Sequence, residues 1–262
     1  MEWDASLLSF EKVGDRKEIR QRMVDHYREV GFQGEAYIQE KMDFSSLYHI
    51  LSRGEKIGLF AKHRDGSLVN LIIDPSHRSH DSEIFDTVRR RYRIRRAEVP
   101  GFDLHYLGPA ALKARKTNVL GWYFSDGMDV EPEPPKEGLL WKRVMKNDKD
   151  RVKEASGDFF NPIDYALDAC ELYYVLDGED MKGIGILAEH YYTENAASCG
   201  MYVSENCRRS GYGRYIISTL KRMAVDRGLV PVAGCAVDNI GSRRTLEGAG
   251  FMVKAPHFEL LY

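Results

Sequence analysis

A glycine-rich turn joins a short apolar segment to an amphipathic one, and this junction limits the folds that the chain can adopt. Residues 199–203 have the composition of a β-strand, and residues 215–224 have the pattern of a helix. Between them stand Arg208, Gly211 and Gly213. Glycines let backbone N–H groups approach a ligand closely, and the positive end of the helix dipole would face it. The sequence therefore predicts a pocket for an anionic phosphate at this junction.

The spacing of the glycines excludes the two commonest phosphate-binding motifs. The junction has no G-x-x-x-x-G-K-[ST], which excludes a P-loop, and no G-x-G-x-x-G, which excludes the dinucleotide fingerprint. The pattern present is Arg-x-x-Gly-x-Gly. It resembles the pyrophosphate-binding loop of the GNAT superfamily of acyl-CoA-dependent N-acetyltransferases, whose pattern is Gln/Arg-x-x-Gly-x-Gly/Ala.

A second motif follows at the separation expected for that superfamily. Residues 229–237 are apolar and strand-like, and the next stretch resembles the GNAT pattern Asn-x-x-Ser/Ala, a short helix, Glu and Gly-Phe. The matching residues are Asn239, Ser242, Glu247, Gly250 and Phe251. The last strands are expected at residues 251–254 and 258–262. The resemblance covers roughly residues 137–262.

The segments upstream agree with the same fold. Strands are expected at residues 139–144, 171–176, 181–192 and 196–203, with helices near 150–160 and 163–170. This order is the order of the GNAT fold. The predicted fold class is therefore α/β (α+β), with a mixed, mostly antiparallel central sheet flanked by helices, known as the acyl-CoA N-acyltransferase fold.

The first half of the chain resembles a degenerate copy of the second half. Four segments repeat at an offset of about 130 residues, namely 71–78 with 201–208, 82–92 with the helix from Arg214 onward, 99–100 with 230–231, and 118–122 with 247–251. Asp81 and Glu83 take the places of Gly211 and Gly213, and two carboxylates would repel a pyrophosphate. A chance likeness between short strand–helix–strand patterns is the alternative.

The sequence accordingly predicts two GNAT-like domains. Residues 1–130 form a degenerate N-terminal domain, and residues 139–262 form the GNAT acetyltransferase domain. The linker between them, residues 131–138, carries three prolines among acidic residues, which favour an extended connector.

The resemblance implies a cosubstrate and a set of residues that bind it. Acetyl-CoA would be the cosubstrate, with no metal. The expected binding residues are Met201, Tyr202, Val203, Arg208, Arg209, Ser210, Gly211, Tyr212, Gly213, Arg214, Asn239 and Ser242. Asn239 is an equally good helix N-cap. The candidate catalytic residues are Glu189, Tyr202 and Ser242.

One departure from the family pattern concerns the general acid. Many GNAT enzymes carry a tyrosine just before the glutamate of the last helix, and Leu246 stands here. Protonation of the leaving thiolate must then come from another group or from water. Cys199 and Cys235 could form an acyl-cysteine intermediate, although a role as small core residues is favoured.

The most specific function that these motifs imply is an acetyl-CoA-dependent N-acetyltransferase. Its acceptor would be a primary amine of a small molecule, such as an amino acid, polyamine, amino sugar or antibiotic, and the sequence does not choose among them. The alternative is a non-catalytic acyl-CoA-binding regulator or scaffold. A weaker alternative is RNA binding by the six arginines between Arg89 and Arg96, for which a solvated helix face is the favoured reading.

Composition, charge and motif spacing limit the cellular location and the partners that we expect for this protein. The formal charge of −2 gives no global signature of nucleic-acid binding, and no apolar run approaches the length of a membrane span. The four cysteines lack metal-site spacing, and the N-terminus lacks a signal peptide's pattern. We expect a cytoplasmic protein, with no membrane partner, nucleic acid disfavoured, and a monomer rather than a homodimer.

Overall fold

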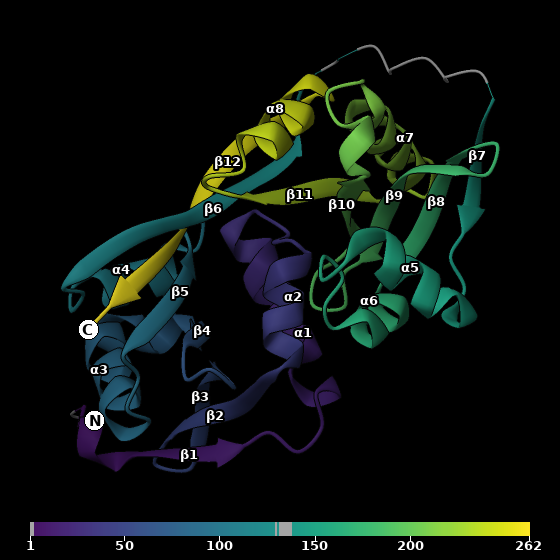
Figure 1. Ribbon diagram of the computed structural model, residues 1–262. Coiled ribbons are helices and arrows are strands. Elements are labelled where there is room, and N and C mark those ends of the chain that lie inside the picture. The colour runs from purple at the N-terminus through teal and green to yellow at the C-terminus, as the bar shows by residue number, and fades with distance from the viewer. Residues whose placement is uncertain (1–2, 129, 131–137) are drawn as a thin grey trace. The chain divides into compact units, whose positions relative to one another are not determined.

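The computed structural model of the protein describes residues 3–128, 130 and 138–262, which fall into two units (Figure 1). Unit 1 takes in the described residues of Met1–Trp122, together with Tyr191–Thr193 and Ala255–Tyr262. Unit 2 takes in those of Tyr123–His190 and Glu194–Lys254. Of the predicted linker, only Gly138 is described.

Unit 1 alternates short helices with strands that lie in one mostly antiparallel sheet. Its strands run in the order β1-β2-β3-β4-β5-β12, and only β4 and β5 are parallel. The elements are η1 (Ala5–Leu7), β1 (Leu8–Lys12), α1 (Lys17–Val30), α2 (Ala36–Asp43), β2 (Ser45–Ser52), β3 (Glu55–His63), β4 (Leu68–Ile73), η2 (Pro75–His80), α3 (Asp81–Arg91), β5 (Arg96–Pro100), α4 (Leu104–Ala111), the first part of β6 (Lys116–Asp126) and the second part of β12 (Phe251–Leu261).

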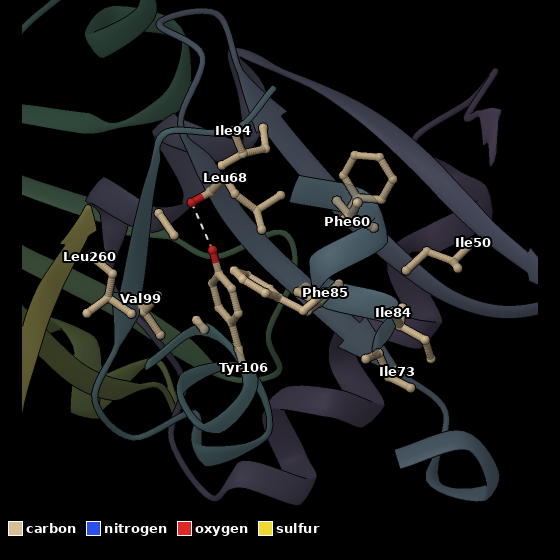
Figure 2. Packing of buried hydrophobic residues seen from close by; sticks show 14 of the residues in the cluster. Ile50, Phe60, Leu68, Ile73, Ile84, Phe85, Ile94, Val99, Tyr106 and Leu260 are labelled. Carbon is tan, nitrogen blue, oxygen red and sulfur yellow. Dashed lines mark hydrogen bonds between the residues drawn. The ribbon is translucent and has the colours of Figure 1, made fainter. Parts of the chain in front are cut away.

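A fully buried tyrosine lies in the core of unit 1. Tyr106 of α4 is fully buried, and its hydroxyl donates a hydrogen bond of 2.9 Å to the Leu68 carbonyl oxygen (Figure 2). Phe85 of α3, Val99 of β5 and Leu260 of β12 belong to the same buried cluster. Because a buried hydroxyl without a partner is costly, this bond fixes the place of α4 on the sheet.

Unit 2 repeats the same plan with a longer third helix, α7, which has 15 residues where α3 has 11. Its strands run in the order β11-β10-β9-β8-β7, and only β10 and β11 are parallel. The elements are β7 (Leu139–Arg143), η3 (Lys146–Asp148), α5 (Lys149–Ser156), α6 (Ile163–Ala169), β8 (Glu171–Asp177), β9 (Asp180–Glu189), β10 (Ala196–Val203), η4 (Glu205–Cys207), α7 (Tyr212–Asp226), β11 (Val230–Ala236) and α8 (Ile240–Gly248), with parts of β6 and β12.

Two glycines let α7 approach the sheet of unit 2 closely. A Cβ atom at Gly183 would lie 2.9 Å from the Ile216 side chain and 2.4 Å from the Tyr202 carbonyl oxygen. At Gly185 it would lie 3.0 Å from the ring of Trp141. Side chains at these two positions of β9 would therefore push α7 away from β10, the strand that it must accompany.

The predicted fold class is confirmed, with two corrections to the predicted elements. The strands expected at residues 251–254 and 258–262 are one continuous strand, β12, whose first part belongs to unit 2 and second part to unit 1. The repeat assigned to residues 118–122 is wrong, because those residues lie in β6 whereas Glu247 and Gly248 end α8. The offset shifts because α3 has 11 residues and α7 has 15.

The arginine run between Arg89 and Arg96 is largely engaged within unit 1. Arg89 and Arg90 form ion pairs with Asp86 at 2.7 and 2.6 Å, and Arg96 pairs with Asp65 at 2.6 Å. These contacts support the interpretation of the run as a solvated face of unit 1. Among the residues that the structure describes, no helix combines the length and the apolar character needed to cross a membrane.

We expect Tyr106→Phe to lower the free energy of unfolding by about 1 kcal/mol, because it leaves the buried Leu68 carbonyl without its donor. Urea denaturation of the full chain would measure the loss. Tyr48→Phe is the matched control, because Tyr48 packs against the same core. An unchanged free energy in Tyr106→Phe, or an equal loss in the control, would contradict this account of the bond.

Unit 2 needs residues that precede the predicted linker. Tyr123 and Phe124 are almost fully buried, and Asp126 forms an ion pair of 2.6 Å with Lys221. We therefore expect a fragment of residues 123–254 to unfold cooperatively on heating, followed by circular dichroism. A fragment of residues 139–262 lacks this segment and should show no cooperative transition. A cooperative transition in the second fragment alone would overturn this assignment.

Candidate functional site

The two parallel strands of unit 2 separate after three pairs of residues. β10 pairs with β11 only from Ala196 to Ser198, but it stays paired with β9 as far as Val203, opposite Gly183. One edge of β10 is therefore open from Cys199 onward. An unpaired strand edge offers a row of backbone donors and acceptors to a ligand.

Alternation along β10 identifies the groups that face this opening. The Ala196 carbonyl accepts a bond from His190 on the β9 side, and the Ser204 N–H donates to Lys182 on the same side. Residues of even number therefore direct their backbone groups to β9, and those of odd number direct theirs to the opening. Met201 and Val203 thus present N–H and C=O groups to the opening, whereas the backbone groups of Tyr202 serve the pairing with β9.

A groove of about 1090 Å³ follows the separation of the strands. Its walls come from β10, the turn before α7, the end of β11 and the start of α8. The predicted cofactor-binding residues that line it are Met201, Tyr202, Val203, Arg208, Arg209, Gly211, Gly213, Arg214, Asn239 and Ser242. Of the predicted set, Ser210 and Tyr212 do not line the groove, although they flank Gly211 in the chain.

The turn before α7 contains left-handed backbone conformations, which glycine adopts more easily than other residues. Gly211 is the N-cap of α7 with φ +82°, and Arg209 has φ +64°, both in the left-handed region. Gly213 meets a different limit, since a Cβ there would lie 3.0 Å from the Met201 sulfur. The first bond inside the helix runs from the Tyr215 N–H to the Gly211 carbonyl, so the earlier amides precede the helical ladder at the groove.

The lining of the groove is strongly positive. Arg208, Arg209, Arg214 and Arg244 line it, and no aspartate or glutamate is among the lining residues. The chain as a whole carries a formal charge of −2. The positive charge is therefore local, and it fits a ligand with several negative charges.

The start of α8 confirms the capping role of Asn239. Its Oδ1 atom accepts a hydrogen bond of 3.0 Å from the Ser242 N–H. Both residues also line the groove. The capping bond thus positions the Ser242 hydroxyl group at the end of the groove formed by α8.

The three candidate catalytic residues lie in different surroundings. Tyr202 packs beside Phe159, and its hydroxyl donates a 2.8 Å bond to the Ala155 carbonyl. Glu189 lies outside the groove lining, with its side chain 60% exposed and 3.6 Å from Arg227. Only Ser242 and Tyr202 are brought to the groove. All three stay predictions as catalytic residues.

The cysteines differ in their fitness for nucleophilic chemistry. Burial raises the pKa of the Cys199 thiol to about 12, so its reactive thiolate is scarce at neutral pH. Cys235 lines the groove and is half-buried. Cys207 is buried, and its sulfur contacts the Asn206 side chain. These surroundings favour core roles for Cys199 and Cys207.

Phe159 and Arg244 are among the lining residues that sequence reasoning missed. Phe159 is 54% exposed, and its ring lies 5.3 Å from that of Tyr202. Arg244 lies on α8, between two residues of the predicted Asn-x-x-Ser and Glu pattern. The signal for Phe159 was weak, since it follows α5 in a segment with no periodicity.

The two parallel strands of unit 1, β4 and β5, also separate early, but a side chain fills the space next to them. β4 and β5 pair at Leu68 and Ala97 only. Asp103 caps α4 by accepting a bond from the Tyr106 N–H, as Asn239 does for Ser242 in α8. Tyr106 thus stands where unit 2 has Ser242, and its ring occupies the space beside Leu68 (Figure 2).

The start of α3 also lacks the positive charge that arginines give to the turn before α7. Asp81 and Glu83 lie in the first turn of α3, one residue away from the predicted correspondence with Gly211 and Gly213. Trp3 stacks on His80 at 4.3 Å and donates a bond to Glu83. Within the described ranges, no group of three or more histidine, cysteine or acidic residues could hold a metal ion.

Comparison with known proteins places both halves in one family. The family model described as "Acetyltransferase (GNAT) domain" matches residues 15–127, and "Acetyltransferase (GNAT) family" matches residues 141–251. No curated protein gives a significant match to the chain.

Solved structures agree on the fold. An acetyltransferase from the GNAT family of Colwellia psychrerythraea is similar with a TM-score of 0.81 at 12% identity, over 97% of this chain and 99% of that one. A tandem GNAT protein from the clavulanic acid biosynthesis pathway has a TM-score of 0.66 at 11% identity, over 97% and 98%. A GCN5-related N-acetyltransferase from Sphaerobacter thermophilus has a TM-score of 0.58 at 13% identity, over 95% and 94%.

At these identities the likeness establishes the fold alone, while the two family models establish the relationship. The groove of unit 2, with its open strand edge and glycine turn, lies within the second matched segment. The chain carries two GNAT domains and belongs to the GNAT acetyltransferase family.

Proposed function

We propose that unit 2 is an N-acetyltransferase that binds acetyl-CoA in its groove and transfers the acetyl group to a primary amine of a small molecule. The observation that carries this proposal is the open edge of β10 beside the glycine start of α7. Acetyl-CoA carries a thioester and a pyrophosphate on one molecule, so it can occupy the open strand edge and the glycine turn together.

The turn before α7 would hold the pyrophosphate. The left-handed Gly211 turns the chain so that the first amides of α7 precede the helical ladder, and the helix dipole adds positive potential there. Arg208 and Arg209 add charge from the same turn. The amide-bearing pantetheine arm would pair with the open edge of β10, as a further strand does in β-augmentation.

The same edge would assist the chemistry. When the amine attacks the thioester, negative charge develops on the carbonyl oxygen, and fixed backbone donors stabilise it. The N–H groups of Met201 and Val203 face the groove and are held by the pairing of their neighbours with β9. Because they need no rearrangement, these donors would act from the outset of the reaction.

The groove of unit 2 lacks the tyrosine that donates a proton in many GNAT enzymes. Leu246 is buried and lines the groove where many GNAT enzymes carry a tyrosine. The Ser242 hydroxyl group is our candidate proton donor to the leaving thiolate. Glu189 is our candidate base for the acceptor amine, and its side chain lies 3.6 Å from Arg227.

A second function rests on one specific observation. Leu246 offers no proton, which suits a protein that binds acyl-CoA without turning it over. Such a regulator would bind acetyl-CoA as tightly as an enzyme does, but it would release no thiol when amines are added. A thiol-release assay over amino acids, polyamines, amino sugars and aminoglycosides separates the two functions.

We expect acetyl-CoA to bind with a stoichiometry near one per chain, and Gly211→Glu to weaken binding at least about thirtyfold. The substitution brings a carboxylate to the phosphate site, and each of the two effects, repulsion and backbone strain, is worth roughly 1–2 kcal/mol. Isothermal titration calorimetry of the full chain would measure both values.

The matched control keeps the backbone shape without the charge. Gly211→Asn places a neutral residue that tolerates the left-handed conformation, so binding should stay within about fivefold of the unaltered protein. If the unaltered protein does not bind acetyl-CoA, the proposed function is wrong. If Gly211→Glu binds normally, the turn does not hold the pyrophosphate.

We expect Cys199→Ala to retain turnover. With a pKa of about 12, the thiol is ionised to roughly one part in ten thousand at pH 8, too little to serve as a nucleophile. Initial-rate kinetics should show intersecting rather than parallel lines, because both substrates must be bound together. Parallel lines together with an inactive Cys199→Ala would establish an acyl-cysteine intermediate instead.

A further inference from the structure

The side chains of β10 alternate between the two faces of the sheet of unit 2. Met201 points toward α7, since a Cβ atom at Gly213 would lie 3.0 Å from its sulfur. Tyr202 points to the other face, where its hydroxyl donates a 2.8 Å hydrogen bond to the Ala155 carbonyl oxygen of α5. Because residues two apart in a strand share a face, Gly200 lies on the face of Tyr202.

Four lining residues form what we call the aromatic wall of the groove, namely Phe159, Ile186, Gly200 and Tyr202. Phe159 follows α5, is 54% exposed and holds its ring 5.3 Å from that of Tyr202. Ile186 of β9 pairs with Gly200 and packs against the same cluster as Tyr202. A Cβ atom at Gly200 would lie 3.2 Å from the Cδ1 atom of Ile186, so a larger residue there would displace Ile186 and change the wall.

The aromatic wall offers apolar surface and carries no charged group. The Tyr202 hydroxyl is already engaged with the Ala155 carbonyl. The arginines that line the groove belong instead to the turn before α7, to α7 and to α8. Among the described residues, no aspartate or glutamate lines the groove. The wall therefore fits an apolar group, and aromatic rings prefer another ring as a neighbour.

The aromatic wall borders the place where the acceptor must meet the thioester. Tyr202 lies between Met201 and Val203, whose N–H groups are our proposed donors to the thioester oxygen. The turn that would hold the pyrophosphate leads into α7, which packs on the opposite face of the sheet. Because both substrates must be bound together, the face of the aromatic wall is the one that the cosubstrate leaves to the acceptor.

We propose that the acceptor is an apolar primary amine with an aromatic ring, which the aromatic wall binds beside the thioester. The proposal rests on the proposed function and names the acceptor class for the same groove. In the transfer, the amine nitrogen bonds to the acetyl carbon, the carbon–sulfur bond breaks with its electron pair passing to sulfur, and one amine proton ends on the thiol of CoA. Polyamines and aminoglycosides carry further ammonium groups, for which the described lining offers no carboxylate.

The test compares three acceptors in the thiol-release assay, with the full chain and acetyl-CoA. Phenethylamine carries the ring, ethanolamine carries a primary amine without it, and spermidine carries additional positive charges. We expect kcat/KM for phenethylamine to exceed that of each other amine by at least about tenfold, which corresponds to about 1.4 kcal/mol. Calorimetric titration with acetyl-CoA alone checks cosubstrate binding in the same samples.

Phe159→Ala removes the exposed ring of the aromatic wall. We expect kcat/KM for phenethylamine to fall by about tenfold, mainly through a higher KM, because the ring contributes equally to binding in the ground state and the transition state. The turnover of ethanolamine and the affinity for acetyl-CoA should change by less than about twofold. Leu140→Ala is the matched control, because Leu140 of β7 is 61% exposed and is not among the lining residues. It should keep the preference of the unaltered protein.

The remaining outcomes separate this inference from the function on which it rests. Turnover of ethanolamine or spermidine as efficient as that of phenethylamine overturns the acceptor class and leaves the transferase intact. The acceptor class is also overturned if Phe159→Ala weakens acetyl-CoA binding but spares phenethylamine, or if Leu140→Ala causes the same loss as Phe159→Ala. If acetyl-CoA does not bind, or binds while none of the amines releases thiol, the proposed transferase function itself fails.

Discussion

The early parting of β10 from β11 is the constraint on which the site of unit 2 depends. The two strands share three residue pairs and then separate, while β10 stays attached to β9 through its whole length. A strand that lost both neighbours would lose its shape, and one that kept both would have no free donors. The glycines of β9 belong to the same arrangement, since Gly183 and Gly185 let α7 pack against the sheet beside the opening.

Unit 1 shows what the same topology becomes when the opening is filled. Its strands β4 and β5 also part at once, yet Tyr106 lies between them with its hydroxyl on the Leu68 carbonyl. The Tyr106 hydroxyl and the Leu68 carbonyl thus satisfy each other inside the core of unit 1. A large buried side chain therefore stands in unit 1 at the position where unit 2 carries the smaller Ser242.

Electrostatics completes the contrast between the units. The first turn of α7 and the face of α8 gather arginines around a groove without carboxylates, although the whole chain is slightly acidic. The first turn of α3 carries Asp81 and Glu83 instead, and Arg89, Arg90 and Arg96 of the later arginine run form ion pairs with Asp86 and Asp65. The arginine-lined groove and the longest arginine run of the sequence therefore lie in different units.

The sequence by itself determined the elements of unit 2 and the glycine turn before α7, because these depend on local features. Glycine at position 211 adopts a conformation that few residues accept, and Asn239 caps the helix that begins beside it. The sequence also indicated a repeated plan, but it misaligned the last part of the repeat, since the difference in length between α3 and α7 leaves no local mark.

Only the tertiary structure decided which residues meet. Arg214 lies thirty-four positions before Gly248, and its side chain reaches that residue because α7 and α8 pack together. The hydroxyl of Tyr202 is directed to the Ala155 carbonyl by the packing of α5, which no spacing along β10 could predict. Likewise, β12 reads as two strands because Pro256 interrupts its pattern, and long-range pairing makes it one. Contacts between distant segments depend on burial and pairing, whereas turns and caps depend on a few adjacent residues.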